Sequence, residues 1–283
     1  MPLPVSLNGA RSAADGPAVP MSPADLAESA LAAVAAGAGE VLVHPRTPCG
    51  RESLSPRVVG PVLEAMRGAG VLVPLSVSAS ASASASASAS ASASASASAG
   101  IGAGPDPAGR LERVRSWTVL PDRAAVSFAE PGAAELAEAL LARGVAVDAV
   151  VPLGGAAGPE PMARFLAWPV RAPGRVRLAA ELASADPALV AGLRGLPPVA
   201  VLLYGREAAA WPVLRLAARC GTGARTGVGD VLHLPDGRRA RSNAELVAAA
   251  LAERAWAVSG RAVSARPVGE PAAGGPAPTG VSR

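Results

Sequence analysis

Residues 40–46 read Glu-Val-Leu-Val-His-Pro-Arg, and this stretch decides the class of fold. Its centre has the apolar, β-branched character of a buried strand, which ends at His44. Ser55-Pro56, a pair typical of a helix start, then opens a segment with apolar residues at helical spacing from Val58 to Met66. Strand, loop and helix in this order form the repeating unit of a parallel α/β sheet.

The same unit recurs along the chain, with further helix starts at Ser22-Pro23, Asp186-Pro187 and Ser242-Asn243. The predicted strands are Pro4–Asn8, Glu40–His44, Val71–Val77, Ala124–Phe128, Val145–Val151, Val176–Glu181, Val199–Tyr204 and Ala224–Asp230. Eight βα units within about 250 residues favour a closed barrel over the alternative, an open doubly wound sheet. We therefore predict an α/β fold, a single-domain (β/α)8 TIM barrel over residues 1–265.

A low-complexity segment interrupts this pattern directly after the third predicted strand. Residues 78–99 are eleven successive Ser-Ala pairs, which bury too little apolar surface to offset the entropy of ordering them. We predict that 78–99 is a disordered insertion at the catalytic face of the barrel, and that the Pro- and Gly-rich residues 266–283 form a disordered tail.

The composition excludes several classes of function. The chain has 283 residues, a net charge of +4 and no lysine, so a lysine Schiff base is excluded. Its arginines lie among acidic residues without aromatic neighbours, which argues against nucleic-acid binding. No apolar run reaches the roughly 18 residues that span a membrane, and Cys49 and Cys220 are too few for a disulfide framework. These features predict a cytoplasmic protein without a membrane segment or a signal peptide.

Polar residues gather where the predicted strands end, which is where barrel enzymes place their active groups. They are Asn8, Arg11, His44, Arg46, Ser127, Glu130, Asp148, Glu181, Tyr204, Glu207, Arg225 and Asp230. Such a ring of arginines and acids is typical of an anion-binding cavity. Arg225 and Asp230 are an odd number of residues apart, so their side chains meet only if the strand ends in a bend, which Gly227 and Gly229 permit.

Several motifs keep the order and spacing of one known family. They are residues 7–11 (Leu-Asn-Gly-Ala-Arg), 43–46 (Val-His-Pro-Arg), 50–54 (Gly-Arg-Glu-Ser-Leu), 117–122 (Trp-Thr-Val-Leu-Pro-Asp), 130–132 (Glu-Pro-Gly), 225–230 (Arg-Thr-Gly-Val-Gly-Asp), 234–237 (Leu-Pro-Asp-Gly) and 243–246 (Asn-Ala-Glu-Leu). In these motifs the chain resembles the beta-keto acid cleavage enzymes, also known as 3-keto-5-aminohexanoate cleavage proteins. The likeness covers nearly everything except the Ser-Ala segment and the tail.

The resemblance implies a metal-dependent barrel that exchanges an acyl group between a beta-keto acid and acetyl-CoA, releasing acetoacetate and a new CoA ester. It implies zinc held by a His-x-His pair and a glutamate. His44 matches the second histidine, but the first falls on Leu42 and the glutamate on Gly229. Arg225 and Asp230 match the catalytic Arg and Asp of the family.

These departures leave two hypotheses open. One is a working acyltransferase with a weakened metal site, because one imidazole cannot hold a zinc ion that normally takes three protein ligands. The other is a non-catalytic relative that binds a CoA or keto acid ligand, or is only structural. Beside His44 as metal ligand and Arg225 and Asp230 as catalytic residues, we predict four substrate-binding residues, Asn8, Arg46, Ser127 and Glu130. We also expect a homo-oligomer.

Overall fold

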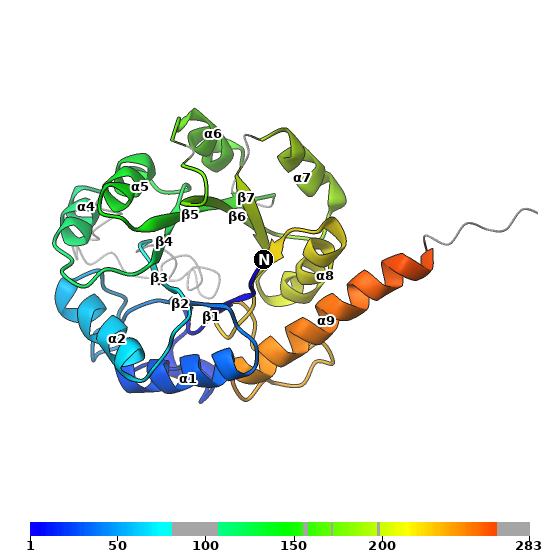
Figure 1. The fold of residues 1–283 in the computed structure, drawn as a ribbon, viewed down its shortest axis with the longest axis horizontal. Coiled ribbons are helices and arrows are strands. Elements are labelled where there is room, and N and C mark those ends of the chain that lie inside the picture. The colour runs from blue at the N-terminus through cyan, green and yellow to red at the C-terminus, as the bar shows by residue number, and fades with distance from the viewer. Residues whose placement is uncertain (81–106, 155–157, 171, 197–198, 265–283) are drawn as a thin grey trace, which may run out of the picture.

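The computed structural model describes residues 1–80, 107–154, 158–170, 172–196 and 199–264. Their eight parallel strands follow one another around the sheet in sequence order, with helices outside (Figure 1). The strands are β1 (Pro4–Ser6), β2 (Glu40–Val43), β3 (Leu75–Ser78), β4 (Arg123–Ser127), β5 (Ala146–Leu153), β6 (Val176–Leu182), β7 (Ala200–Tyr204) and β8 (Gly223–Ala224). The ring closes where Ser6 N–H donates to the Thr226 carbonyl over 2.8 Å and Thr226 N–H donates to the Pro4 carbonyl over 3.2 Å. The predicted (β/α)8 barrel is confirmed, and an open sheet is excluded.

Helices cover the outside of this ring. They are α1 (Pro23–Ala35), α2 (Pro56–Gly68), α4 (Pro107–Arg115), α5 (Ala133–Ala142), α6 (Glu160–Ala167), α7 (Pro187–Ala191), α8 (Ala210–Cys220) and α9 (Asn243–Ser264), with short 3-10 turns η1 (Ala13–Asp15), η3 (Gly192–Gly195) and η4 (Glu207–Ala209). Ser22 caps α1 by accepting from Asp25 N–H, while the Asp25 carboxylate accepts from Ser22 N–H. Ser55 precedes α2 without a side-chain capping bond.

Alternation along each strand separates a core from an interior lining. In β2, Val41 and Val43 belong to the hydrophobic core between strands and helices, whereas Glu40 and Leu42 line a small cavity inside the barrel. The core is built mostly from Val, Leu and Ala, with Phe128 and Phe165 in edge-to-face contact at 5.6 Å between ring centroids.

Two predicted boundaries are wrong in ways that matter for the site. The eighth strand was expected to run to Asp230, but β8 ends at Ala224 and residues 227–230 form a turn, because Asp230 N–H donates back to the Gly227 carbonyl over 2.9 Å. We call residues 225–230 the 225–230 turn. Strand β3 was expected over Val71–Val77, but it spans Leu75–Ser78.

The first three residues of the Ser-Ala segment therefore belong to the barrel itself. Ser78 is the last residue of β3, Ala79 is fully buried, and its N–H donates to the Ala125 carbonyl over 2.8 Å. Ser80 accepts a hydrogen bond from Ser127 N–H through its hydroxyl, over 2.8 Å. The insertion predicted at residues 78–99 thus starts after Ser80 at the earliest, because 78–80 pair with β4. Residues 81–99 and the predicted tail at 266–283 lie outside the described residues.

Candidate active site

The carboxyl ends of β1 and β2 are tied together by Asn8. Its side-chain amide donates to the His44 carbonyl over 3.0 Å, and its side-chain oxygen accepts from His44 N–H over 2.9 Å. Asn8 is fully buried, so this reciprocal pair fixes the backbone of His44 and hence the direction of its imidazole. Contact of Asn8 with substrate stays a prediction.

The 225–230 turn brings together the two residues predicted to be catalytic. Arg225 Nε donates to one carboxylate oxygen of Asp230 over 2.9 Å, and Nη2 donates to the other over 2.6 Å. The bend that this pairing requires is present, with Gly227 at a φ of 135°. Val228 N–H donates to the side-chain oxygen of Asn243, the first residue of α9, over 2.8 Å. The sequence indicated only that Asn243 lies at a helix start. In the structure, its side chain also holds the 225–230 turn in place.

Strands β6 and β7 add an aromatic and acidic side to the same end of the barrel. The Arg225 guanidinium carbon lies 3.5 Å from the centroid of the Tyr204 ring, a cation–π contact. The Tyr204 hydroxyl donates to Glu181 over 2.7 Å, and Arg206 Nε lies 3.0 Å from the other Glu181 oxygen. Burial, followed by the Glu181 charge, raises the pKa of Tyr204 above its usual value, so the phenol stays protonated at neutral pH.

His44 lies among positive charges. It is buried, and its Nδ1 has no hydrogen-bond partner in the described part of the chain. Burial is the main cause that lowers the pKa of His44 well below its usual value, and the charges of Arg206, Arg225 and Arg46 add to it. The imidazole is therefore neutral at pH 7.

Arg46 is held by its own loop. It donates to the Gly9 carbonyl over 2.6 Å and to the Gly50 carbonyl over 2.8 Å, and lies 3.3 Å from a Glu52 carboxylate oxygen. Burial outweighs the neighbouring positive charges of Arg46 and Arg206 and raises the pKa of Glu52 to about 7. The sequence analysis did not place Glu52 among the candidate site residues, because it lies in a loop and not at the end of a predicted strand.

Two further predicted substrate ligands lie at the end of β4. Ser127 is half-buried there. Glu130 forms a buried ion pair with Arg110 of α4, which also donates to the Pro131 carbonyl over 2.6 Å. Direct contact of Ser127, Glu130 or Arg46 with substrate stays a prediction, and the observed role of Glu130 is to fasten α4 to the β4 loop.

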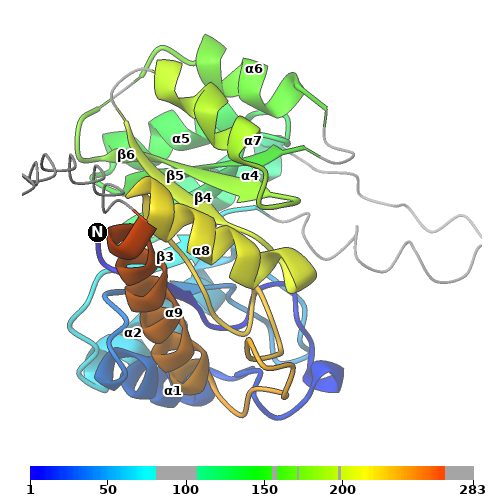
Figure 2. The ribbon, with the colours of Figure 1, turned by 90° about the vertical axis from the view of Figure 1, so that its right-hand side faces the viewer.

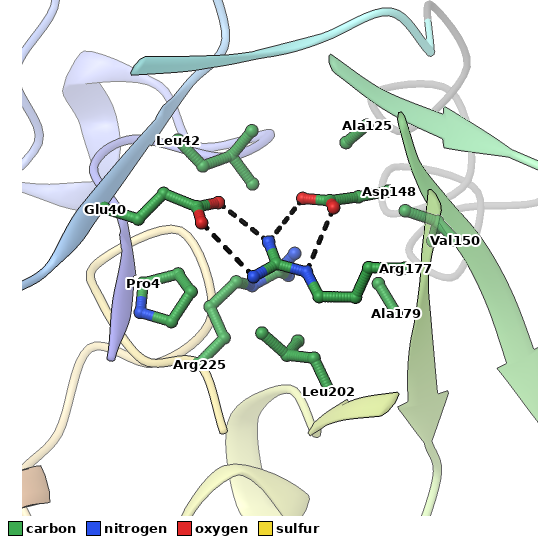
Figure 3. A pocket seen from close by; sticks show the side chains of 10 residues that line it. All are labelled: Pro4, Glu40, Leu42, Ala125, Asp148, Val150, Arg177, Ala179, Leu202 and Arg225. Atoms are coloured by element: carbon green, nitrogen blue, oxygen red, sulfur yellow. Dashed lines mark hydrogen bonds and ion pairs between the residues drawn. The ribbon is translucent and has the colours of Figure 1, made fainter. Parts of the chain in front are cut away.

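A second polar layer lies deeper, at the amino-terminal half of the strands (Figure 3). Arg177 donates to Asp148 over 2.6 and 3.0 Å and to Glu40 over 2.8 and 3.2 Å. Arg123 donates to the same Asp148 oxygen over 2.5 and 3.0 Å. The inclusion of Asp148 in the ring at the strand ends was therefore wrong: it lies near the start of β5 and is fully engaged by two arginines. Arg225 and Leu42 line the same small cavity as the residues of this charge cluster.

The residues present do not fit a zinc ion. Leu42 lines the apolar part of the cavity beneath the site (Figure 3). A Cβ on Gly229 would lie 2.8 Å from Gly9 N and 2.9 Å from its Cα, and closer still to the Ser6 hydroxyl, so the loop after β1 and the Ser6 side chain occupy the space that a glutamate needs. No group of three His, Cys, Asp or Glu side chains among the described residues is arranged to hold a metal. Three arginines near His44 disfavour a cation further.

The fold and this geometry define a (β/α)8 barrel whose candidate site residues lie at the carboxyl ends of its strands, the usual place for active groups in barrel enzymes. The sequence matches the family model described as beta-keto acid cleavage enzyme over residues 3–146 and 174–264. The chain belongs to the beta-keto acid cleavage enzyme family. A search of curated proteins found no match.

Solved structures share the barrel. The apo structure of ObcA superposes with a TM-score of 0.58 at 16% identity, covering 87% of this chain and 63% of ObcA. A binary complex of ObcA with oxaloacetate gives a TM-score of 0.56 at 14% identity, covering 88% and 67%. The homocysteine methyltransferase MmuM from Escherichia coli, in its apo form, gives 0.51 at 16%, covering 89% and 95%. Identities this low show a common fold alone, and the chain spans about two thirds of ObcA.

Proposed function

We propose that the protein is a C-acyltransferase of the beta-keto acid cleavage type. It exchanges the acyl group of a beta-keto acid with acetyl-CoA, so that acetoacetate and a new CoA ester are formed. Both partners are small molecules. Family membership supports the reaction class, and the buried Arg225–Asp230 pair is the observation that carries the proposal, because it stands where the resemblance requires it.

Ligands of ObcA, a protein with a similar fold, belong to the same chemical classes as the proposed keto acid and CoA ester. ObcA has been solved with oxaloacetate and, in a ternary complex, with a C4-CoA adduct and oxalate. A keto acid with a carboxylate group suits an end of the barrel that carries Arg206 and Arg225. The neutral imidazole of His44 offers a hydrogen-bonding group without a competing charge.

The proposed reaction is expected to be slow. Zinc would polarise the keto oxygen, a contribution of several kcal/mol in metal-assisted enzymes, and the described residues bring together no site that fits it. The test is chromatography of CoA esters after incubating the protein with acetyl-CoA and a panel of beta-keto acids. We expect a new CoA ester and acetoacetate in equal amounts, at a rate that falls in Arg225→Lys. No CoA ester above the protein-free rate would refute the proposal.

The second candidate is a non-catalytic keto acid or CoA binding protein. Leu42 and the tight contact of Gly229 with Gly9 favour it, because they remove the metal that the family chemistry uses. Ligand binding with no new CoA ester would establish this alternative.

The proposal includes a cytoplasmic setting and a homo-oligomer. Both cysteines are free and exposed, which suits a reducing compartment, and none of the described helices is long and apolar enough to cross a membrane. Helix α9 lies beside α1 and α8 and then extends beyond the barrel (Figures 1 and 2), with Trp256 and Val258 68% and 56% exposed. Such an apolar surface supports self-association, which sedimentation measurements test.

A further inference from the structure

We propose that Arg206 binds the carboxylate of the keto acid ligand without any metal ion, together with the unused amino group of Arg225. This inference rests on the proposed function for the class of ligand, but not on turnover. It assigns a binding role to a residue outside the ring predicted from the sequence.

Both guanidinium groups have N–H donors left over. Arg225 donates from Nε and Nη2 to Asp230, whereas Arg206 forms an ion pair with Glu181, its Nε lying 3.0 Å from a carboxylate oxygen without making a hydrogen bond. In the described part of the chain, no hydrogen bond or ion pair engages Nη1 of Arg225 or either Nη of Arg206. The acids hold the two arginines in place, while these remaining N–H groups can donate to an anionic oxygen.

Arg206 is the more accessible of the two. Its side chain is 38% exposed, against 8% for Arg225. Arg206 is therefore open to solvent, whereas Arg225 is buried and packs over the Tyr204 ring. The charge of Arg206 adds to the burial that lowers the pKa of His44 and opposes the burial that raises the pKa of Glu52, so both side chains lie within reach of its field. A ligand held by Arg206 would therefore lie above the imidazole and near the 225–230 turn.

The loop after β7 is built to hold this arginine. Glu207 has a φ of 48°, a left-handed conformation that residues with a side chain rarely adopt. Its N–H donates to the Asp230 carbonyl over 2.9 Å, and its carboxylate pairs with Arg11. These contacts tie the residue next to Arg206 to the 225–230 turn, so that both arginines belong to one rigid unit.

The experiment is calorimetric titration of the EDTA-treated, metal-free protein with acetoacetate. We expect saturable binding that added zinc does not strengthen. Arg206→Gln should weaken it by about tenfold or more, because hydrogen bonds to charged groups contribute about 1.5–3 kcal/mol. Arg206→Lys should recover only part of the loss, since a point charge does not reproduce a planar fork. Acetone, which lacks the carboxylate, should not bind.

The matched control is Arg238→Gln, which removes an exposed arginine paired with Asp236 away from the site. It should bind acetoacetate like the parent protein. Binding that requires zinc, or undiminished affinity in Arg206→Gln, would overturn the inference. Metal-free binding without any CoA ester formation would uphold it while refuting the proposed reaction, so the two failures are distinguishable.

Discussion

At the scale of single residues, the backbone of Gly229 packs directly against Gly9 and Ser6. From the sequence, a glycine at the position of a metal-binding glutamate looks like a simple loss. In the structure, this position has no room for a side chain, because the backbone of Gly229 lies against Gly9 and Ser6. A lost ligand of this kind cannot be restored by one substitution.

Because of this contact, Leu42→His combined with Gly229→Glu should not rebuild the zinc site that the resemblance implies. We now expect Gly229→Glu to lower stability by about 1–3 kcal/mol through overpacking, and the double variant to bind no additional zinc. Gly229→Ala should already be destabilised. Gly68→Ala, where a Cβ meets nothing within 4 Å, should be neutral or stabilising. Thermal melts and zinc titrations measure both, and a stable double variant with one bound zinc would contradict the steric argument.

A second prediction at this scale concerns Glu52. Its pKa is raised to about 7 in the folded protein by burial, from an ordinary value of 4.5. The folded state therefore holds this proton more tightly than the unfolded state, and the free energy of unfolding should fall as pH rises from about 4.5 to 7. Glu52→Gln should remove that part of the slope, whereas Glu28→Gln, at an exposed position, should not. Parallel stability profiles for Glu52→Gln and the parent would show that Glu52 does not titrate in this window.

At the scale of elements, the sequence predicted the order of strands and helices but not where strands stop. Hydrophobic pattern places β2 and β6 to within one or two residues, because each has an uninterrupted apolar centre, Val41–Val43 and Leu178–Ala180. It fails at β8, because the glycines of the 225–230 turn end the strand earlier than predicted. It also fails at β3, where the first residues of the Ser-Ala segment pair with β4 although their sequence resembles the rest of that segment. Pairing with a distant strand leaves no local signal.

The start of the Ser-Ala segment gives the test at this scale. Replacing residues 81–99 with a short Gly-Ser linker should leave the melting temperature nearly unchanged, as expected for a segment with little apolar surface to bury. Extending the replacement to 78–99 should lower it by several degrees, because Ser78, Ala79 and Ser80 are each bonded to β4. Equal melting temperatures for the two variants would mean that these contacts contribute nothing.

At the scale of the whole molecule, repetition made the barrel predictable, whereas contacts between distant residues did not. Eight similar units are visible in the sequence, and so are polar residues at strand ends. The pairing of Arg177 with Glu40 joins positions 137 residues apart, and Arg206 was passed over although Tyr204 and Glu207 beside it were noted. Only the folded structure shows which polar groups are already engaged in structural hydrogen bonds or ion pairs, as Asn8 and Glu130 are.

The proposed arginine-based keto acid site would take the place of the metal site that the resemblance implies. Elemental analysis of the protein purified without chelators tests it most directly. The account predicts well under one equivalent of zinc per chain, and acetoacetate binding that is the same before and after EDTA treatment. One equivalent of tightly bound zinc, with binding lost on its removal, would contradict the account and require ligands that the described residues do not bring together.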